Sequence, residues 1–150
     1  MAQSLAQIFL HIVFSTKDRA PFIQPEVEDE LYAYMAKILN DLDCHAYKIY
    51  GCKDHVHIAC NLSRTITVSQ LLEEVKRSSS KWIKTKGREF KNFSWQKGYG
   101  AFSFGRSQID DVVRYIEKQK HIHEKKTFKQ EFLEMLEKYE VDYDEKYLWD

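Results

Sequence analysis

The sequence predicts an α+β domain in which an antiparallel sheet carries helices on one face. Two patterns support this prediction: runs of β-forming residues alternate with amphipathic helical runs, and their order is strand, helix, strand, strand, helix, strand. A chain of 150 residues can bury one sizeable core, so we expect a single domain over residues 1–150. An apolar content of 43% and a charged content of 31% are typical of a globular protein.

The first half of the chain supplies three strands and one helix. Residues 5–14 form an apolar, β-forming run, and Pro25 opens an acidic helix that extends to about residue 42. Two short strands, residues 45–50 and 55–62, surround a turn and indicate a hairpin. The apolar stripe predicted for the helix comprises Val27, Leu31, Tyr34, Met35, Ile38 and Leu39.

The second half supplies a second helix for the sheet, the last strand and two further helices. Thr67 begins a capping box and a helix that extends to about Lys86. The aromatic and glycine-rich residues 93–104 indicate one or two strands. Helices are predicted over 107–125 and 128–139, whereas the last residues show no periodicity. The complete order matches the ferredoxin-like, split βαβ arrangement, followed by a C-terminal helix that carries a tyrosine.

Hydropathy and cysteine usage predict a cytoplasmic protein with no membrane partner. No uninterrupted apolar run approaches the ~20 residues of a membrane span, and the N-terminus lacks the basic segment of a signal peptide. Cys44, Cys52 and Cys60 lack a CxxC spacing, which argues against a zinc knuckle and fits a reducing compartment. We expect these cysteines to be small buried hydrophobic residues.

A net charge of zero conceals one strongly basic segment. Residues 76–97 carry eight lysines and arginines against the single acidic residue Glu89, whereas residues 24–43 are acidic. A basic segment suits a nucleic-acid backbone, although a solvated helix face has the same composition. The residues that we expect at DNA phosphates are Lys17, Lys76, Arg77, Lys81, Lys84 and Arg88. The aromatic residues that could stack on unpaired bases, or that could instead belong to the core, are Trp82, Phe93, Trp95 and Tyr99.

Two pairs of residues could form a catalytic site. His55 and His57 are two positions apart on a predicted strand, so their side chains point to the face opposite Val56. Tyr115 and Gln119 are four positions apart on a predicted helix and also share a face. If the fold brings the pairs together, they offer a nitrogen and oxygen metal site beside a phenolic nucleophile. The alternatives are two histidines on an exposed sheet face and a tyrosine whose ring lies at the edge of the core with its hydroxyl in water.

The His-x-His motif is weak by itself, because six histidines in 150 residues give ~0.24 such pairs by chance. A second pair, His121 and His123, indeed lies near a predicted helix end. On a helix this spacing separates two side chains by ~200°. We therefore expect the second pair to be a solvated helix terminus.

Four motifs follow one another along nearly the whole chain: Phe9–Lys17, Asp54–His57, Lys76–Ser79 and Tyr115–Gln119. Each motif alone is modest, but their order and spacing together are specific. In this respect the chain resembles the single-tyrosine HUH transposases, the enzymes of the smallest bacterial insertion sequences, which belong to the insertion-sequence-200-like transposases.

The resemblance implies a role for each member of the two pairs. It implies that His55, His57 and Gln119 are the protein ligands of a divalent metal ion, either Mg²⁺ or Mn²⁺. It implies that Tyr115 is the nucleophile. The sequence shows no general base for this tyrosine. Two imidazoles intrinsically favour later transition metals. The ion that binds most tightly in vitro can therefore differ from the ion that the protein uses in the cell.

The resemblance also implies a reaction and a partner. The enzyme would cleave and rejoin single-stranded DNA at hairpin-containing element ends through a covalent 5′-phosphotyrosine intermediate. It would act as a homodimer in which the tyrosine helix of one subunit completes the metal site of the other. The alternatives are a domesticated relative that processes palindromes, a relaxase or rolling-circle nickase, and a catalytically silent dimer that binds hairpin nucleic acid. Retention of both histidines, the tyrosine and the glutamine favours an enzyme.

Overall fold

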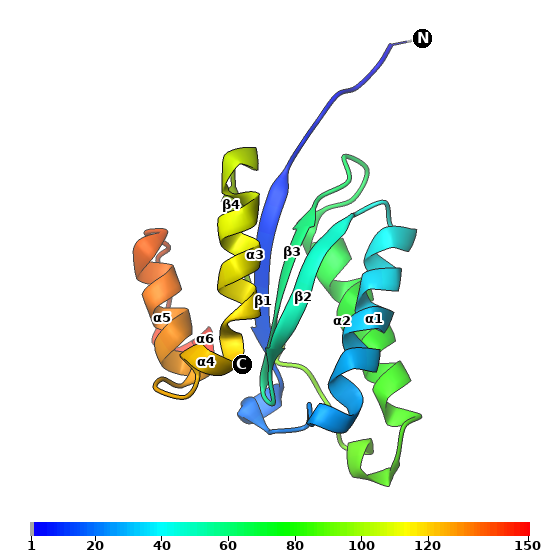
Figure 1. Cartoon of the computed structure of the whole chain (residues 1–150), viewed down its shortest axis with the longest axis vertical. Helices are drawn as coiled ribbons and strands as arrows, with labels where there is room; N and C mark the ends of the chain where they lie inside the picture. Colours follow the sequence, from blue (N-terminus) through cyan, green and yellow to red (C-terminus); the bar gives the residue numbers. More distant parts are fainter. Residues whose placement is uncertain (1) are drawn as a thin grey trace.

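A four-stranded antiparallel sheet forms the centre of the computed structural model, which describes residues 2–150 (Figure 1). Its strands stand in the order β2-β3-β1-β4, and each neighbouring pair is antiparallel. This is the strand order of the predicted ferredoxin-like fold. The first strand of the hairpin, β2, lies at one edge of the sheet, and the last strand, β4, lies at the other. The strands are β1 (Phe9–Ser15), β2 (Ala46–Cys52), β3 (His55–Asn61) and β4 (Gly100–Phe104).

Helices lie on both faces of this sheet (Figure 1). The first face is covered by α1 (Pro25–Asp41) and α2 (Val68–Lys84), the two helices of the split βαβ arrangement. The second face carries α3 (Ile109–Glu117) and α5 (Phe128–Lys138), with α3 packed against β2 and β3. Short helical turns complete the chain: η1 (Lys17–Arg19), η2 (Arg88–Phe90), η3 (Arg106–Gln108), α4 (Gln119–Ile122) and α6 (Glu145–Leu148).

The alternation of side chains along the strands separates a large apolar core from a polar face. Val56, Ile58 and Cys60 of β3 point into the core under α1 and α2, as the sequence predicts. His55 and His57 point to the opposite face and are fully buried there. They are buried because α3, α4 and α5 cover that face, which excludes the exposed sheet face considered as the alternative. The sheet therefore places apolar packing on one side and the histidines on the other.

Most predicted boundaries agree with the structure, and the exceptions have local causes. The first strand begins at Phe9 rather than at residue 5, and Leu5 stays 86% exposed because no strand lies beside it. On α1, Tyr32 rather than Tyr34 belongs to the buried stripe, although Tyr34 packs against its edge. The capping box at Thr67 is present, since its side chain accepts the backbone N–H of Gln70 at 3.0 Å.

The end of the chain returns to the sheet edge, although its sequence shows no periodicity. The backbone carbonyl of Asp150 accepts the N–H of Gly98 at 3.0 Å, and that of Trp149 accepts Arg19 Nη1 at 3.0 Å. The Trp149 ring also lies near Phe128 and Phe132 of α5. These contacts tie the end of the chain to α5 and to the loop before β4.

The structure shows how deeply each cysteine is buried and how apolar the helices are. Cys44 and Cys60 are buried in the large core, as expected, whereas Cys52 is only half-buried. All three thiols are free. Among residues 2–150, no helix combines the length and the apolar character that a bilayer span requires.

Gly51 of β2 lies close against the backbone of β3. Gly51 pairs with Val56, and a methyl group at Gly51 would collide with the carbonyl oxygen of His55 and lie 2.9 Å from the Cα of Val56. These atoms are backbone and cannot rotate away. Glycine at this position therefore lets the two strands approach at the point where β3 presents its first histidine.

We expect Gly51→Ala to lower the free energy of unfolding by about 1–3 kcal/mol, because the added methyl group overpacks a backbone contact. Urea denaturation followed by circular dichroism measures this change. Gly98→Ala is the matched control, since a methyl group there meets its nearest neighbour, the Asp150 carbonyl oxygen, at an ordinary 3.6 Å. Equal stability of the two variants would contradict the argument.

Candidate active site

The fold brings the two predicted pairs into one cluster on the second face of the sheet. His55 and His57 come from β3, Tyr115 from α3 and Gln119 from the start of α4. The Nε2 atom of His55 lies 2.9 Å from Oε1 of Gln119. His55, His57 and Gln119 are all fully buried, and Tyr115 is half-buried. The alternative of a tyrosine with its hydroxyl in water does not hold.

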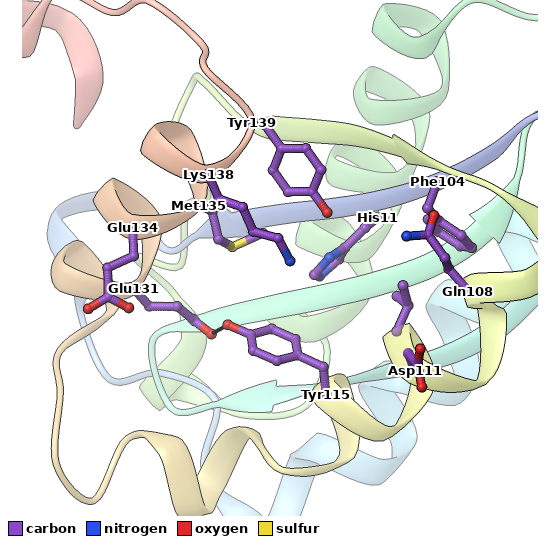
Figure 2. Close-up of a pocket in the computed structure, with 11 residues that line it drawn as sticks. His11, Phe104, Gln108, Asp111, Tyr115, Glu131, Glu134, Met135, Lys138 and Tyr139 are labelled. Carbon is purple, nitrogen blue, oxygen red and sulfur yellow. Dashed lines mark hydrogen bonds between the residues drawn. The ribbon is translucent and has the colours of Figure 1, made fainter.

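A buried carboxylate, Glu131 of α5, connects these residues. Its Oε1 atom lies 3.1 Å from Nε2 of His57 and 3.6 Å from Nε2 of His55. Its Oε2 atom accepts the hydroxyl of Tyr115 and, at 2.8 Å, the side-chain N–H of Gln119. The close-up in Figure 2 shows Tyr115 and Glu131 pointing toward one another. Glu131 thus faces the histidines with one oxygen and the tyrosine with the other.

Sequence reasoning missed Glu131, although a signal was present. It lies on the apolar stripe of α5 between Phe128 and Met135, where a solvated glutamate is out of place. A charged residue on a buried stripe is either paired or functional, because an isolated buried charge is costly. The carboxylate is only 2% exposed and is surrounded by the cluster.

His123 corrects one prediction, since it is not part of a solvated helix terminus. Its Nε2 atom lies 2.9 Å from Oε1 of Glu131 and 3.1 Å from Oε1 of Gln119. His121 remains exposed, so the two members of the second pair have different environments. His123 lies eight residues after Tyr115, which equals two i,i+4 steps along a helix. This spacing was the sequence signal that His123 shares a face with Tyr115 and Gln119.

The helix over residues 107–125 is also interrupted, where the sequence predicts a continuous one. Lys118 leaves helical geometry at φ −90° and ψ 8°, between α3 and α4. Directly after the break, Gln119 makes its buried contacts with His55 and Glu131. Tertiary contacts of this kind override a local helical preference, which amounts to less than about 1 kcal/mol per residue.

Each sheet histidine is held from behind by a second group. The Nδ1 atom of His55 lies 2.7 Å from a carboxylate oxygen of Asp54. The Nδ1 atom of His57 lies 2.8 Å from Nε2 of His11 on β1. Metal-binding histidines typically present one ring nitrogen to the ion while the other is held by a carboxylate, a carbonyl or another polar group. The donor atoms of His55, His57 and Glu131 lie within 4.8 Å of one another, so this group can hold a metal ion.

Burial sets the protonation of the cluster. Burial lowers the pKa of His57 to about 4, although Glu131 opposes the shift, and burial together with His57 lowers the pKa of His11 to about 3. His57 is therefore neutral at pH 7 and free to bind a metal. Burial and the negative charge of Glu131 raise the pKa of Tyr115. Burial alone would raise the pKa of Glu131, but the hydrogen bonds from His123 and His57 hold it below its usual range.

A thiol near the cluster is a weaker donor. Cys52 lies with His55 and His123 in a second group whose donor atoms are within 4.8 Å of one another. Burial and nearby Asp54 raise the pKa of Cys52 to about 12. The thiol is therefore protonated at neutral pH, and binding a metal ion through its sulfur would require release of that proton.

A cavity of about 430 Å³ opens beside Tyr115 between the sheet, α3 and α5. The buried His11 and Glu131 line it together with the aromatic residues Phe104 and Tyr139 (Figure 2). Its volume is within the range of small-ligand sites. Tyr115 is one of the residues that line this cavity.

The predicted phosphate-binding residues do not gather at this cluster. Arg77, Lys81 and Lys84 lie on α2, which covers the opposite face of the sheet, and their side chains are exposed. Arg88 is exposed in η2, just beyond the end of the same helix. Lys17 is different, because it is exposed next to Thr16, whose N–H donates to the carbonyl oxygen of Asp54 at 2.8 Å.

Lys76 has a structural role. Its ammonium group donates to the carbonyl oxygens of Gln96, Lys97 and Gly98 at 2.9, 3.2 and 2.6 Å. An ammonium group has three donors, so none remains for a phosphate. Burial also lowers the pKa of Lys76 to about 8. We conclude that Lys76 fixes the loop before β4 rather than binding DNA.

The four aromatic residues divide between the core and the surface. Phe93 and Trp95 are buried in the large core, where Trp95 Nε1 donates to Ser79 at 3.0 Å. Trp82 stacks on Tyr34 with ring centroids 5.2 Å apart. Tyr99 is the exposed member of the four, at 38%, and the Lys76 ammonium lies 5.6 Å from the centroid of its ring.

The whole cluster is assembled within one chain. The tyrosine helix α3 packs against β2 and β3 of its own sheet, and Gln119 reaches the histidine of the same chain. The homodimer with shared sites that the resemblance implies concerns a second subunit, and it stays a prediction.

Several solved structures share this fold, including the following two. A candidate transposase from Deinococcus radiodurans R1 superposes with a TM-score of 0.61 and 17% identity, covering 79% of this chain and 98% of its own. A REP-associated tyrosine transposase bound to a REP hairpin superposes with a TM-score of 0.60 and 15% identity, covering 82% of this chain and 74% of its own. At these identities the similarity concerns the fold.

The family follows from the sequence itself. No curated protein sequence matches the chain. The family model described as "Transposase IS200 like" matches residues 4–119, which contain β1 to β4, both sheet histidines, Tyr115 and Gln119. The chain therefore belongs to the IS200-like transposase family.

Proposed function

We propose that this transposase cleaves and rejoins single-stranded DNA through a covalent 5′-phosphotyrosine at Tyr115. The observation that carries the proposal is the position of the Tyr115 hydroxyl. It is hydrogen-bonded to Glu131, whose other oxygen lies 3.1 Å from His57. A nucleophile, a carboxylate and metal-binding nitrogens are thus in direct contact, beside a cavity that admits a substrate.

The residues of this chain supply the nucleophile and its orientation. The phenolic oxygen of Tyr115 would attack the phosphorus atom, forming an O–P bond as the bond between phosphorus and the departing 3′-oxygen breaks. Glu131 Oε2, which already accepts the hydroxyl, would hold the phenolic proton. The covalent phosphotyrosine conserves the energy of the cleaved linkage, so that a 3′-hydroxyl can attack it and rejoin the strand without ATP.

A divalent ion, Mg²⁺ or Mn²⁺ by the family resemblance, would supply Lewis-acid polarisation of the phosphate when bound by His55, His57 and Gln119. The donor set fits such an ion. The sheet histidines are buried, are oriented by Asp54 and His11, and present Nε2 to side-chain oxygens.

We propose a hairpin in single-stranded DNA as the substrate. One structure with the same fold contains a REP-associated tyrosine transposase bound to a REP hairpin. On this chain, the exposed cations of α2 lie on the opposite face of the sheet from Tyr115. A hairpin bound at α2 would therefore have to send its single-stranded flank around the sheet edge to reach the tyrosine.

The alternative from another functional class is a hairpin-binding protein that has lost catalysis. The buried cluster argues against it. A protein that only binds DNA gains nothing from a carboxylate and three imidazoles buried together, which cost desolvation energy. The same structure fits a mobile transposase and a domesticated relative equally well, since both would use the same chemistry.

We expect Tyr115→Phe to abolish the covalent adduct while leaving hairpin binding within about threefold of wild type, because only the hydroxyl is removed. A denaturing gel with labelled single-stranded DNA from the genomic flanks of the gene, with and without Mn²⁺, detects the adduct. Tyr139→Phe is the matched control, since Tyr139 lines the same cavity but stacks on Phe102. An adduct that persists in Tyr115→Phe would remove Tyr115 from the mechanism.

We expect a mixture of Tyr115→Phe and His57→Ala to form no adduct, because α3 packs on the sheet of its own chain. The resemblance to dimeric enzymes predicts the opposite, recovery through heterodimers. Native mass spectrometry of the mixture establishes whether heterodimers form, and the same gel reports cleavage. Recovery in confirmed heterodimers would show that tyrosine helices exchange between subunits.

We expect Lys81→Ala to weaken DNA binding and to reduce the slope of log affinity against log salt by roughly 0.7, the value for one contact to a single-stranded phosphate.

Lys76→Ala should leave that slope unchanged and lower the free energy of unfolding by about 1–3 kcal/mol, because three carbonyl groups lose their charged donor. Fluorescence anisotropy at several salt concentrations and urea denaturation measure the two effects. The reverse pattern would exchange the roles of the two lysines.

A further inference from the structure

We propose that Lys138 of α5 binds the DNA phosphate next to the one that Tyr115 would attack, and that the cavity beside Tyr115 holds the unpaired base of the same nucleotide against Phe104. The ligand is therefore one nucleotide of a single DNA strand. The inference rests on the proposed function, since it concerns the same substrate. It adds contacts that neither the motif spacing nor the family resemblance provides.

A polynucleotide at Tyr115 needs a cation nearby, because every nucleotide brings a negative phosphate. The exposed cations of α2 lie on the opposite face of the sheet. Three carboxylates, those of Asp111, Glu131 and Glu134, line the cavity beside the tyrosine. Among the residues that line this cavity in the described part of the chain, Lys138 is the only lysine or arginine. A phosphate in the cavity would therefore meet Lys138.

The carboxylates of the cavity have other partners than Lys138. Asp111 forms an ion pair with Arg114, and Glu134 Oε2 lies 2.6 Å from the ammonium nitrogen of Lys126. Glu134 and Lys138 have the i,i+4 spacing of a helix ion pair, yet Glu134 faces Lys126 instead. Over residues 2–150, Lys138 forms no salt bridge. Its ammonium group is thus available to an anion.

The geometry of α5 directs Lys138 toward the tyrosine. Glu131, which accepts the Tyr115 hydroxyl, and Lys138 are two helical turns apart and share a face. Because side chains on a helix lean toward its N-terminus, the ammonium group is directed back toward Glu131. Figure 2 shows this group pointing into the space between Tyr139 and Tyr115. A phosphate bound there would be a close neighbour of one at the Tyr115 hydroxyl.

The cavity itself suits an unpaired base. Its volume of about 430 Å³ is that of a site for one small ligand, and Val112 and Met135 add apolar surface to the ring of Phe104. That ring stacks on Phe9 with centroids 5.6 Å apart. Phe9 does not line the cavity, so it covers only the ring face turned away from it. Bases of every kind stack on aromatic rings, because each base has a π-face.

The position of Phe104 fits the path of the strand. Phe104 is the last residue of β4, which is an edge strand of the sheet. A hairpin at α2 would send its single-stranded flank around such an edge to reach Tyr115. A base held at Phe104 and a phosphate held by Lys138 would fix the strand at two points before the tyrosine attacks, which lowers the entropic cost of orienting it.

Salt-dependent binding tests the phosphate contact. The probe is a short strand of thymidines that contains one 2-aminopurine base and cannot form a hairpin, and the full chain is used with Mn²⁺ present. We expect Lys138→Met to lower its affinity about fivefold at roughly 0.1 M salt, and to reduce the slope of log affinity against log salt by roughly 0.7. Fluorescence anisotropy measures both quantities.

Lys129→Met is the matched control for this charge change. Lys129 belongs to the same helix, but its ammonium nitrogen lies 5.0 Å from the centroid of the Trp149 ring and it does not line the cavity. Its affinity and salt slope should equal those of the wild type. Equal effects of Lys138→Met and Lys129→Met, or no effect of Lys138→Met, would overturn the phosphate contact.

The fluorescence of 2-aminopurine tests the base contact, because stacking on an aromatic ring quenches its emission. We expect quenching by the wild type and by Tyr147→Leu, which removes an exposed ring outside the cavity, and no quenching by Phe104→Leu. Quenching that survives in Phe104→Leu would overturn the proposal. So would a wild-type complex without quenching, or a wild-type affinity weaker than about 1 mM.

Circular dichroism confirms that each variant is folded. If Phe104→Leu fails to fold, Val112→Phe replaces it, because a larger side chain on α3 fills the cavity and should also prevent quenching. Binding and cleavage are separate measurements. Quenching that depends on Phe104, without a DNA adduct from the genomic flanks, would keep the nucleotide site and refute the proposed function. An adduct combined with unaltered binding in Lys138→Met and Phe104→Leu would do the reverse.

Discussion

The buried carboxylate of Glu131 is the interaction on which the active-site half of this protein depends. It receives a hydrogen bond from Tyr115 of α3 and one from Gln119 of α4, and it lies next to histidines of β3. Three helices and the sheet thereby meet at a single charged group. Because an uncompensated buried charge costs several kcal/mol, these contacts together offset the cost of burying the Glu131 carboxylate.

The sheet explains how such a polar cluster exists in a chain of this size. One face supports the large apolar core under α1 and α2, which provides most of the hydrophobic stabilisation. The other face has a small apolar cluster, which includes Val13, Phe102 and Phe132, and can therefore accommodate the histidines. The alternation of side chains in β3 is what assigns Val56 to the first face and His57 to the second.

The sheet also separates the active-site residues from the basic helix α2. The cations of α2 are exposed on the side of the apolar core, whereas Tyr115 lies behind the sheet. Binding energy from the DNA backbone would thus act at a distance from the reacting phosphate and position it, which is how remote contacts contribute to catalysis. Among the predicted cations, Lys17 directly follows Thr16, whose backbone N–H donates to the carbonyl oxygen of Asp54, the residue before His55.

The sequence by itself determined the order of the strands and helices, the face on which each β3 residue lies, and the two pairs of residues that meet in the site. Each depends on the local repeat of side-chain directions, which is two residues along a strand and 3.6 residues along a helix. The capping box at Thr67 and the buried cysteines Cys44 and Cys60 followed from equally local rules. The choice of Tyr34 for the buried stripe failed, because the packing of β2 against α1 selected Tyr32.

Only the tertiary structure decided the environment of each functional group. Glu131 belongs to an amphipathic helix whose outer positions are charged, and its burial depends on where α5 docks. His123 follows a break at Lys118 that local propensity does not predict. Lys76 was indistinguishable from its basic neighbours until three carbonyl groups of a distant loop surrounded it. Contacts between residues far apart in sequence set burial and charge pairing, and these in turn set which groups can bind a metal, a proton or a phosphate.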